Sequence, residues 1–275
     1  MNAIAILAMK EVRDGLRNRW IAMTILVLTG LSLSLYFLGS APTGETKVDG
    51  LAVTLVSLVS LSVYLLPLIA LMLSFDAFVG EFERGTMLLL LTYPVARWQL
   101  IVGKFLGHML ILLLAIVIGC GSIALIVALT GDGTAHDWPA YAAMMASSWL
   151  LGGVFVALGY LISVVVRERA TAVGAAVGLW LSLVVLYDLV LLGALIADKE
   201  QAISEQVLTA LLVANPTDAY RVLNLTAVEG VSQVAGLADI ATKAGIVQAV
   251  PVLVLAAWLL ASVAATIAVL YRREL

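Results

Sequence analysis

The stretch FLGHMLILLLAIVIGCGSIALIVALTG, residues 105–131, contains no Asp, Glu, Lys or Arg. A helix that crosses the ~30 Å hydrocarbon core of a bilayer needs about 20 mainly apolar residues, so this stretch is long enough to cross. It lacks the alternation of a barrel strand, and an open strand would leave its backbone without partners in lipid. The stretch therefore predicts a transmembrane helix and an all-α fold.

Five further stretches of the same kind predict a membrane protein with six transmembrane helices. The chain of 275 residues is 63% hydrophobic and 12% charged, against roughly half apolar and a quarter charged in a soluble domain. Asp188 interrupts one of the six stretches, but a long uncharged run precedes it. We expect a single membrane domain over residues 20–275, with spans at about 20–39, 53–79, 104–130, 139–166, 170–196 and 247–271.

Residues 1–19 are too charged to cross but are amphipathic. Ala5, Met9 and Leu16 lie on one stripe of a helix, whereas Lys10 and Arg13 lie on another side. This pattern predicts an interfacial helix under the cytoplasmic leaflet. A solvated basic tail is the alternative. The apolar run that follows is longer than the core of a signal peptide, which favours an uncleaved first span.

The distribution of Lys and Arg predicts the orientation. With both termini in the cytoplasm, the inside segments hold most of the 15 basic residues, namely Lys10, Arg13, Arg17, Arg19, Arg84, Arg97, Lys104, Arg167, Arg169, Arg272 and Arg273. Cytoplasmic loops are enriched in such residues, so we expect a bacterial inner-membrane protein with cytoplasmic termini. Residues 197–246 then form an extracytoplasmic helical loop, with short helices at the outer surface and a break at Asn215-Pro216.

The cytoplasmic connection at 80–98 carries the most informative pattern. Charged residues precede a glycine, a threonine suited to capping, a short apolar helix and a proline that starts another helix. This predicts a helix-turn-helix that a soluble partner binds, while an ordinary capped loop is the alternative. The candidate residues are Glu81, Glu83, Arg84, Gly85, Thr86, Pro94 and Arg97.

The run Glu-x-Glu-x-Gly-Thr from Glu81, followed by Thr-x-Pro-Val-x-Arg and Gly-Lys, resembles the ABC-2 class of transporter permeases. The resemblance extends over the whole chain and includes the stretch Asn215-Pro216-x-x-x-Tyr220-Arg221. It implies that segment 80–98 is a coupling helix docked on a cytoplasmic ABC ATPase subunit. More narrowly, the chain looks like permeases of nitrous-oxide reductase maturation. That likeness implies a second copy of the chain, a periplasmic NosD-like accessory protein, and assembly of a copper–sulfur centre.

The chain contains no Gly-x-x-x-x-Gly-Lys-Ser/Thr phosphate loop, because Gly103-Lys104 is followed by Phe. We therefore expect no cofactor on this chain, with ATP and Mg bound by the partner ATPase. His108 and Cys120 are about 18 Å apart along one helix, too far to share a metal ion. The net charge of −3 gives no basic field for nucleic acid.

Asp188 is the one carboxylate deep in a predicted span, where charge costs at least ~2–3 kcal/mol unless it is paired, hydrated or protonated. It either lines a pathway or switches conformation, or else hydrogen-bonds to a neighbouring helix or a second copy. Ala170, Gly174 and Gly178 form a small-residue ladder that suits close packing within a bundle or a dimer. An ion-coupled secondary carrier would need more midplane charges, and an intramembrane enzyme would need a nucleophile–base pair or metal cluster.

Overall fold

The computed structural model describes residues 3–39, 50–92, 95–130, 137–197, 204–226 and 247–273. Within these ranges every regular element is a helix. The helices are α1 (Ala3–Leu16), α2 (Arg19–Gly39), α3 (Gly50–Ser74), α4 (Val79–Glu83), α5 (Thr86–Thr92), α6 (Arg97–Thr130), α7 (Asp137–Val165), α8 (Arg169–Trp180), the π-helix η1 (Leu181–Leu186), α9 (Tyr187–Ala197), α10 (Glu205–Ala214), α11 (Pro216–Leu225) and α13 (Ala249–Arg272).

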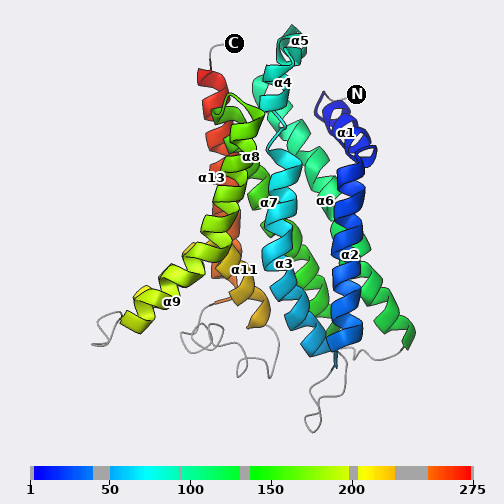
Figure 1. Cartoon of the computed structure of the whole chain (residues 1–275), viewed down its shortest axis with the longest axis vertical. Helices are drawn as coiled ribbons and strands as arrows, with labels where there is room; N and C mark the ends of the chain where they lie inside the picture. The colour runs from blue at the N-terminus through cyan, green and yellow to red at the C-terminus, as the bar shows by residue number, and fades with distance from the viewer. Residues whose placement is uncertain are drawn as a thin grey trace.

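The long helices run side by side, and both chain termini lie at the same end of the bundle (Figure 1). We call this the terminal end. The helices α1, α4 and α5 also lie there, whereas α11 lies toward the opposite, distal end (Figure 1). Termini at the same end agree with an even number of crossings, such as the six that the sequence predicts.

Five helices in the described part of the chain are long and apolar enough to cross a membrane. The bent pair of α1 and α2, whose axes meet at 70°, gives a sixth if it is counted as one span. The predicted all-helical membrane fold is therefore confirmed, while the count of six spans stays a prediction. The helix α6 begins at Arg97, seven residues before the predicted span, because a helix continues into the interface as readily as it crosses lipid.

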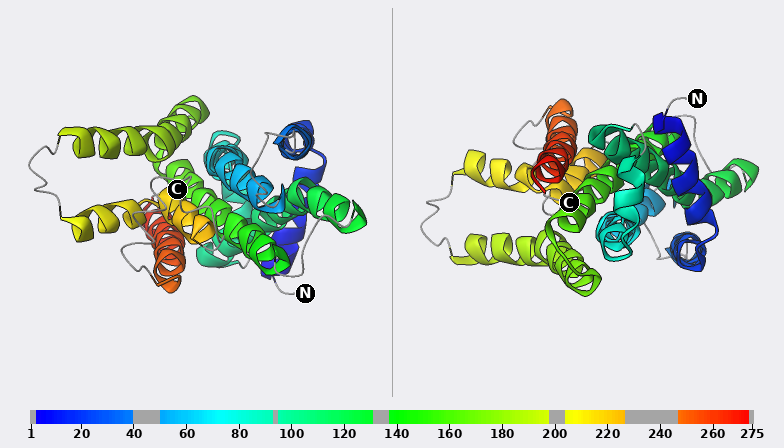
Figure 2. Two further views of the ribbon diagram at one scale, coloured as in Figure 1. Left: turned by 90° about the horizontal axis from the view of Figure 1, so that it is seen from below. Right: turned by 90° about the horizontal axis from the view of Figure 1, so that it is seen from above.

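The centre of the bundle is α7, of whose apolar stretch 72% is buried. The span formed by α8, η1 and α9 is peripheral, since only 11% of its stretch is buried. Figure 2 shows that α9 and α10 extend away from the bundle. Leu191 of α9 and Leu208 and Leu212 of α10 form a small hydrophobic cluster of their own.

The helix α11 is buried, which corrects the expectation that the loop helices lie at the outer surface. Its residues Asp218 and Tyr220 are almost fully enclosed, and it packs on α3, α7 and α13. The predicted break is present, because Asn215 caps α11 by accepting a hydrogen bond from the N–H of Thr217 and Pro216 begins the helix.

The amphipathic helix α1 packs tightly along the first turns of α6. A Cβ atom built on Gly103 would lie 2.7 Å from Leu7 Cβ, and one built on Gly107 would lie 2.9 Å from the carbonyl oxygen of Ala8. Only glycine permits this approach of two backbones. Met9 on the opposite side of α1 is 67% exposed, as expected for a helix with one face in the membrane interface.

Candidate coupling site

The short helix α4 is held by groups from several spans, starting with Ser163 of α7. The Ser163 hydroxyl accepts hydrogen bonds from the backbone N–H groups of Phe78, at 2.9 Å, and Val79, at 3.0 Å. These N–H groups lie at the start of α4, where a helix has no internal acceptors. A side chain of another helix therefore supplies the cap that α4 lacks in its own sequence.

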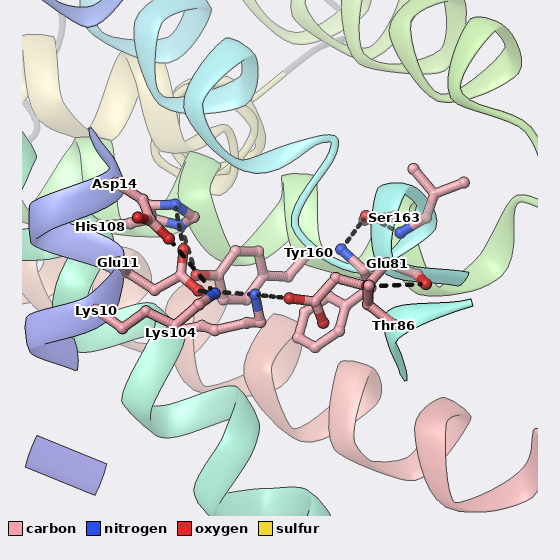
Figure 3. A network of polar contacts seen from close by, with 11 residues as sticks. Lys10, Glu11, Asp14, Glu81, Thr86, Lys104, His108, Tyr160 and Ser163 are labelled. Atoms are coloured by element: carbon pink, nitrogen blue, oxygen red, sulfur yellow. Dashed lines mark hydrogen bonds and ion pairs between the residues drawn. The ribbon is translucent and has the colours of Figure 1, made fainter. Parts of the chain in front are cut away.

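A buried ion cluster joins α4 to α1 and α6 (Figure 3). The Lys104 ammonium lies 2.8 Å from a carboxylate oxygen of Glu11 and 2.8 Å from one of Glu81. The three side chains are only 3%, 11% and 9% exposed. We call Glu11, Lys104 and Glu81 the ion triad. Burial raises the pKa of the Glu11 carboxyl, but the charge and hydrogen bond of Lys104, together with His108 and Lys10 nearby, outweigh this effect and the pKa falls to about 2.

The ion triad continues into α7 through a histidine and a tyrosine. His108 Nε2 lies 3.8 Å from Glu11 Oε2, and His108 Nδ1 lies 2.5 Å from the hydroxyl of Tyr160. The Tyr160 ring also packs edge-on against Phe78, just before α4. The cluster thus connects α1, α6, α7 and the α4 region through polar contacts between largely buried side chains.

The far side of α4 contacts the ends of α8 and α13. Glu83 accepts a hydrogen bond of 2.8 Å from the backbone N–H of Arg169, which places a negative charge at the start of α8, where the helix dipole favours it. The Arg273 guanidinium lies 4.1 Å from the centroid of the Phe82 ring, a cation–π contact. Arg97 donates to the carbonyl oxygen of Leu270 at the end of α13.

The next helix, α5, projects beyond the rest of the bundle (Figure 1). The turn that leads to it contains Gly85, whose φ of 69° lies in the left-handed region that favours glycine. Met87 is buried at 1% exposure, whereas Leu88 and Leu89 are 60% and 65% exposed. Two neighbouring leucines on a projecting tip form an apolar surface available to a partner.

The structure brings most of the predicted candidates together, in different roles. Glu81 is buried, and its carboxylate pairs with Lys104 of the same chain. Glu83 and Arg84 are exposed. Thr86 does not cap α5; its hydroxyl donates to the carbonyl oxygen of Glu81 at 3.4 Å. Pro94 lies outside the described residues.

The sequence reasoning missed Glu11, Lys104 and Ser163 as parts of this site. The available signal in the sequence was a lysine placed beside Gly103 and Gly107, because close helix packing at such glycines favours burial of the neighbouring side chains.

Asp188 lies in a second polar cluster, near α11. Arg221 lies 3.0 Å from Asp188 and 2.8 Å from Asp218. Asn215 and Thr217 both donate to the carbonyl oxygen of Leu183, at 2.8 and 3.1 Å. Leu183 belongs to η1, and π-helices often mark functional positions. Several roles were predicted for Asp188. The structure shows the contact with a neighbouring helix, because Asp188 pairs with Arg221 of α11.

The ladder of Ala170, Gly174 and Gly178 is exposed. A Cβ atom built on Gly174 or Gly178 would meet nothing within 4 Å. This ladder is therefore not used in packing within the described part of the chain, in contrast to the ladder on α6.

A family model for ABC-2 family transporter proteins matches residues 5–275. The chain belongs to this family. It is 42% identical over 276 residues to a probable ABC transporter permease protein NosY of Stutzerimonas stutzeri, with 99% of each chain covered. It is 47% identical over 228 residues, 82% of each chain, to a protein of the same description from Pseudomonas aeruginosa.

The ABC-2 membership identifies the chain as a membrane permease of an ABC transporter, a type of subunit that is typically not catalytic itself. An ATPase partner and a membrane setting follow from this class. Among the described residues, no group of three or more His, Cys, Asp or Glu side chains is placed to hold a metal ion.

Proposed function

We propose that α4 and α5 form the joint through which a cytoplasmic ATPase subunit acts on the spans. The observation that carries this proposal is the contrast between the two helices. Leu88 and Leu89 of α5 are exposed on a projecting tip, whereas α4 contacts α6, α7, α8 and the end of α13. A force applied to α5 therefore reaches several spans at once. The terminal end is cytoplasmic in this proposal.

The resemblance supplies the wider setting that we propose. The ATPase partner binds ATP and Mg, and the permease acts together with a periplasmic NosD-like protein in maturation of the copper–sulfur centre of nitrous-oxide reductase. The permease forms a homodimer through the peripheral span. Two observations support the homodimer. Gly174 and Gly178 are exposed, and small residues permit close helix pairing in lipid. Val190 and Ile196 of α9 are each 71% exposed.

The joint is tested by replacing both exposed leucines of α5 with aspartate. The Leu88→Asp/Leu89→Asp variant should reach the membrane at the normal level but lose most of its co-purifying ATPase, because burying two carboxylates against a partner is costly. Val165→Asp, an exposed apolar residue at the end of α7, is the matched control and should retain the ATPase. Equal ATPase recovery from the double variant and the wild type would contradict the proposal.

A further inference from the structure

A cavity of about 1020 Å³ lies between α1, α2, α3 and α6 toward the terminal end. Its volume is at the upper end of the ~300–1,000 Å³ usual for small-molecule sites. The ion triad forms part of its wall, together with Asp76. The remaining wall is largely apolar, so the cavity has a charged end and an apolar end.

The apolar end of the cavity follows one face of α3. On α3 the lining residues Leu65, Leu68 and Met72 are spaced three or four residues apart, which places them on one side of the helix, and Asp76 lies in the turn that follows. The rise from Leu65 to Asp76 is about 16 Å, close to half of the ~30 Å hydrocarbon core. The cavity thus spans the depth of about one leaflet, with its charged end at the level of the headgroups.

The wall of the cavity reaches the outer surface of α2 and α3. Its lining includes Met23, Val27 and Met72, which are 63%, 48% and 37% exposed. Both helices belong to predicted spans, so these exposed apolar side chains face lipid tails rather than water. A ligand with an acyl chain can reach the cavity from this side.

The charged end offers acceptors and cations together. Glu81 Oε2 and Asp76 Oδ1 are buried and have no hydrogen-bond partner within the described residues. The other oxygen of each carboxylate is held, by Lys104 at 2.8 Å for Glu81 and by Arg169 at 2.6 Å for Asp76, so each carboxylate has one acceptor oxygen left for a donor that enters the cavity. Lys10, which is 48% exposed, and the exposed Arg84 line the same end and can bind a phosphate.

We propose that this cavity holds the headgroup and upper acyl chains of a phospholipid with a primary ammonium group, such as phosphatidylethanolamine. Its ammonium donates to Glu81 and Asp76, its phosphate contacts Lys10 and Arg84, and its chains lie against Leu68 and Met72 of α3. A choline headgroup has no N–H donor and leaves the carboxylate oxygens unpaired, which is costly in a buried site. Assignment of the lipid to the cytoplasmic leaflet rests on the proposed orientation.

The test uses the purified full-length chain in mixed micelles that contain equal amounts of phosphatidylethanolamine, phosphatidylcholine and phosphatidylglycerol. After delipidating washes, mass spectrometry quantifies the retained lipid. The wild type should retain phosphatidylethanolamine at least several-fold over the other two. Glu81→Gln replaces an acceptor oxygen by an N–H₂ donor and should abolish this preference, and Asp76→Asn provides a second test should that variant fold poorly. Leu68→Trp fills the apolar end and should reduce total retention.

Two matched controls should behave as the wild type: Glu168→Gln, an exposed carboxylate at the same end, and Leu253→Trp, an exposed leucine of α13. Equal retention of ethanolamine and choline lipids by the wild type would overturn the proposal. So would displacement of the lipid by soluble phosphoethanolamine at similar concentration, which would assign the cavity to a soluble zwitterion. ATPase recovery, measured on the Leu88→Asp/Leu89→Asp variant, reports separately on the coupling joint.

Discussion

Replacement of Lys104 by methionine should destabilise the protein strongly, because it removes the only cation of the ion triad. Methionine preserves most of the length and volume of the side chain. The variant loses two charge-assisted hydrogen bonds of 2.8 Å, each worth about 1.5–3 kcal/mol, and it leaves Glu11 and Glu81 facing each other without the buried cation between them. Breaking a buried ion pair costs about 3–5 kcal/mol. The two lost hydrogen bonds add up to a similar value, so we expect the free energy of unfolding to fall by about this amount.

The assay is thermal unfolding of the purified chain, followed by the fluorescence of its six tryptophans. We expect the melting temperature of Lys104→Met to fall on the order of 10 °C. Lys10→Met is the matched control. Lys10 lies 3.3 Å from Glu11 but is 48% exposed, so its loss should cost less than about 1 kcal/mol.

The triple variant Lys104→Met/Glu11→Gln/Glu81→Gln separates charge from packing. It removes every charge of the triad, and a neutral buried set is often as stable as the ion pairs that it replaces. Most of the stability lost in Lys104→Met should therefore return. A Lys104→Met variant that melts within 2 or so degrees of the wild type, about the effect of 1 kcal/mol, would refute the assignment of the triad as a structural link.

Gly107→Ala should destabilise the contact of α1 with α6 by about 1–3 kcal/mol, as overpacking does. Gly121→Ala is its control in the same melting assay. The new Cβ would meet Val117 at an ordinary 3.8 Å, so this variant should be neutral or stabilising. Gly85→Val should cost about 1–2 kcal/mol for a left-handed backbone and lower ATPase recovery at normal membrane level; unchanged recovery would argue against a rigid turn. Acidification should weaken the wild type, since the pKa of Glu11 is about 2 in the folded protein and ordinarily 4.5. The stabilisation, about 3 kcal/mol, is complete above pH 4.5 and lost between pH 4.5 and pH 2, and Glu11→Gln should flatten this part of the stability profile.

The positions of the spans were predictable because they depend on local composition. An uncharged run long enough to cross a bilayer has few alternatives, and each predicted span overlaps a helix of the structure. The helix ends were less predictable. The predicted span at 53–79 ends as α3 at Ser74, followed by a turn before α4. Asp76 in this turn pairs with Arg169 at 2.6 Å, and a contact with a residue 93 positions away leaves no local signal in the sequence.

The role of Glu81 shows why the candidate site was harder to predict than the fold. A carboxylate in a polar connection is usually solvated, so the sequence favours exposure and contact with a partner. Its burial depends on Lys104 and Glu11, which come from two other helices brought together by the glycines of α6. The pairing exists only after α1, α4 and α6 have packed.

The burial of α11 has the same kind of origin. Its sequence, PTDAYRVLNL, is polar enough to favour the surface, yet its polar groups find partners inside. The hydroxyl of Tyr220 lies 2.8 Å from that of Ser148, and Asn224 donates to Ser147 at 2.9 Å. Internal hydrogen bonds replace those that water would supply, and this compensation is what allows a polar helix to enter an apolar bundle.

The helix α7 supplies the side chains that bind both α4 and α11. Ser163 of α7 caps α4 at the terminal end, while Ser147 and Ser148 of the same helix bind α11 about 24 Å away by helical rise. The helix between them is continuous from Asp137 to Val165 and is the most buried of the spans. A continuous, tightly packed helix moves as a unit, because bending it would break internal hydrogen bonds and core contacts together. In the proposed coupling, a displacement of α4 would therefore be delivered to α11, and through Asp218, Arg221 and Asp188 to the π-helical region of the peripheral span.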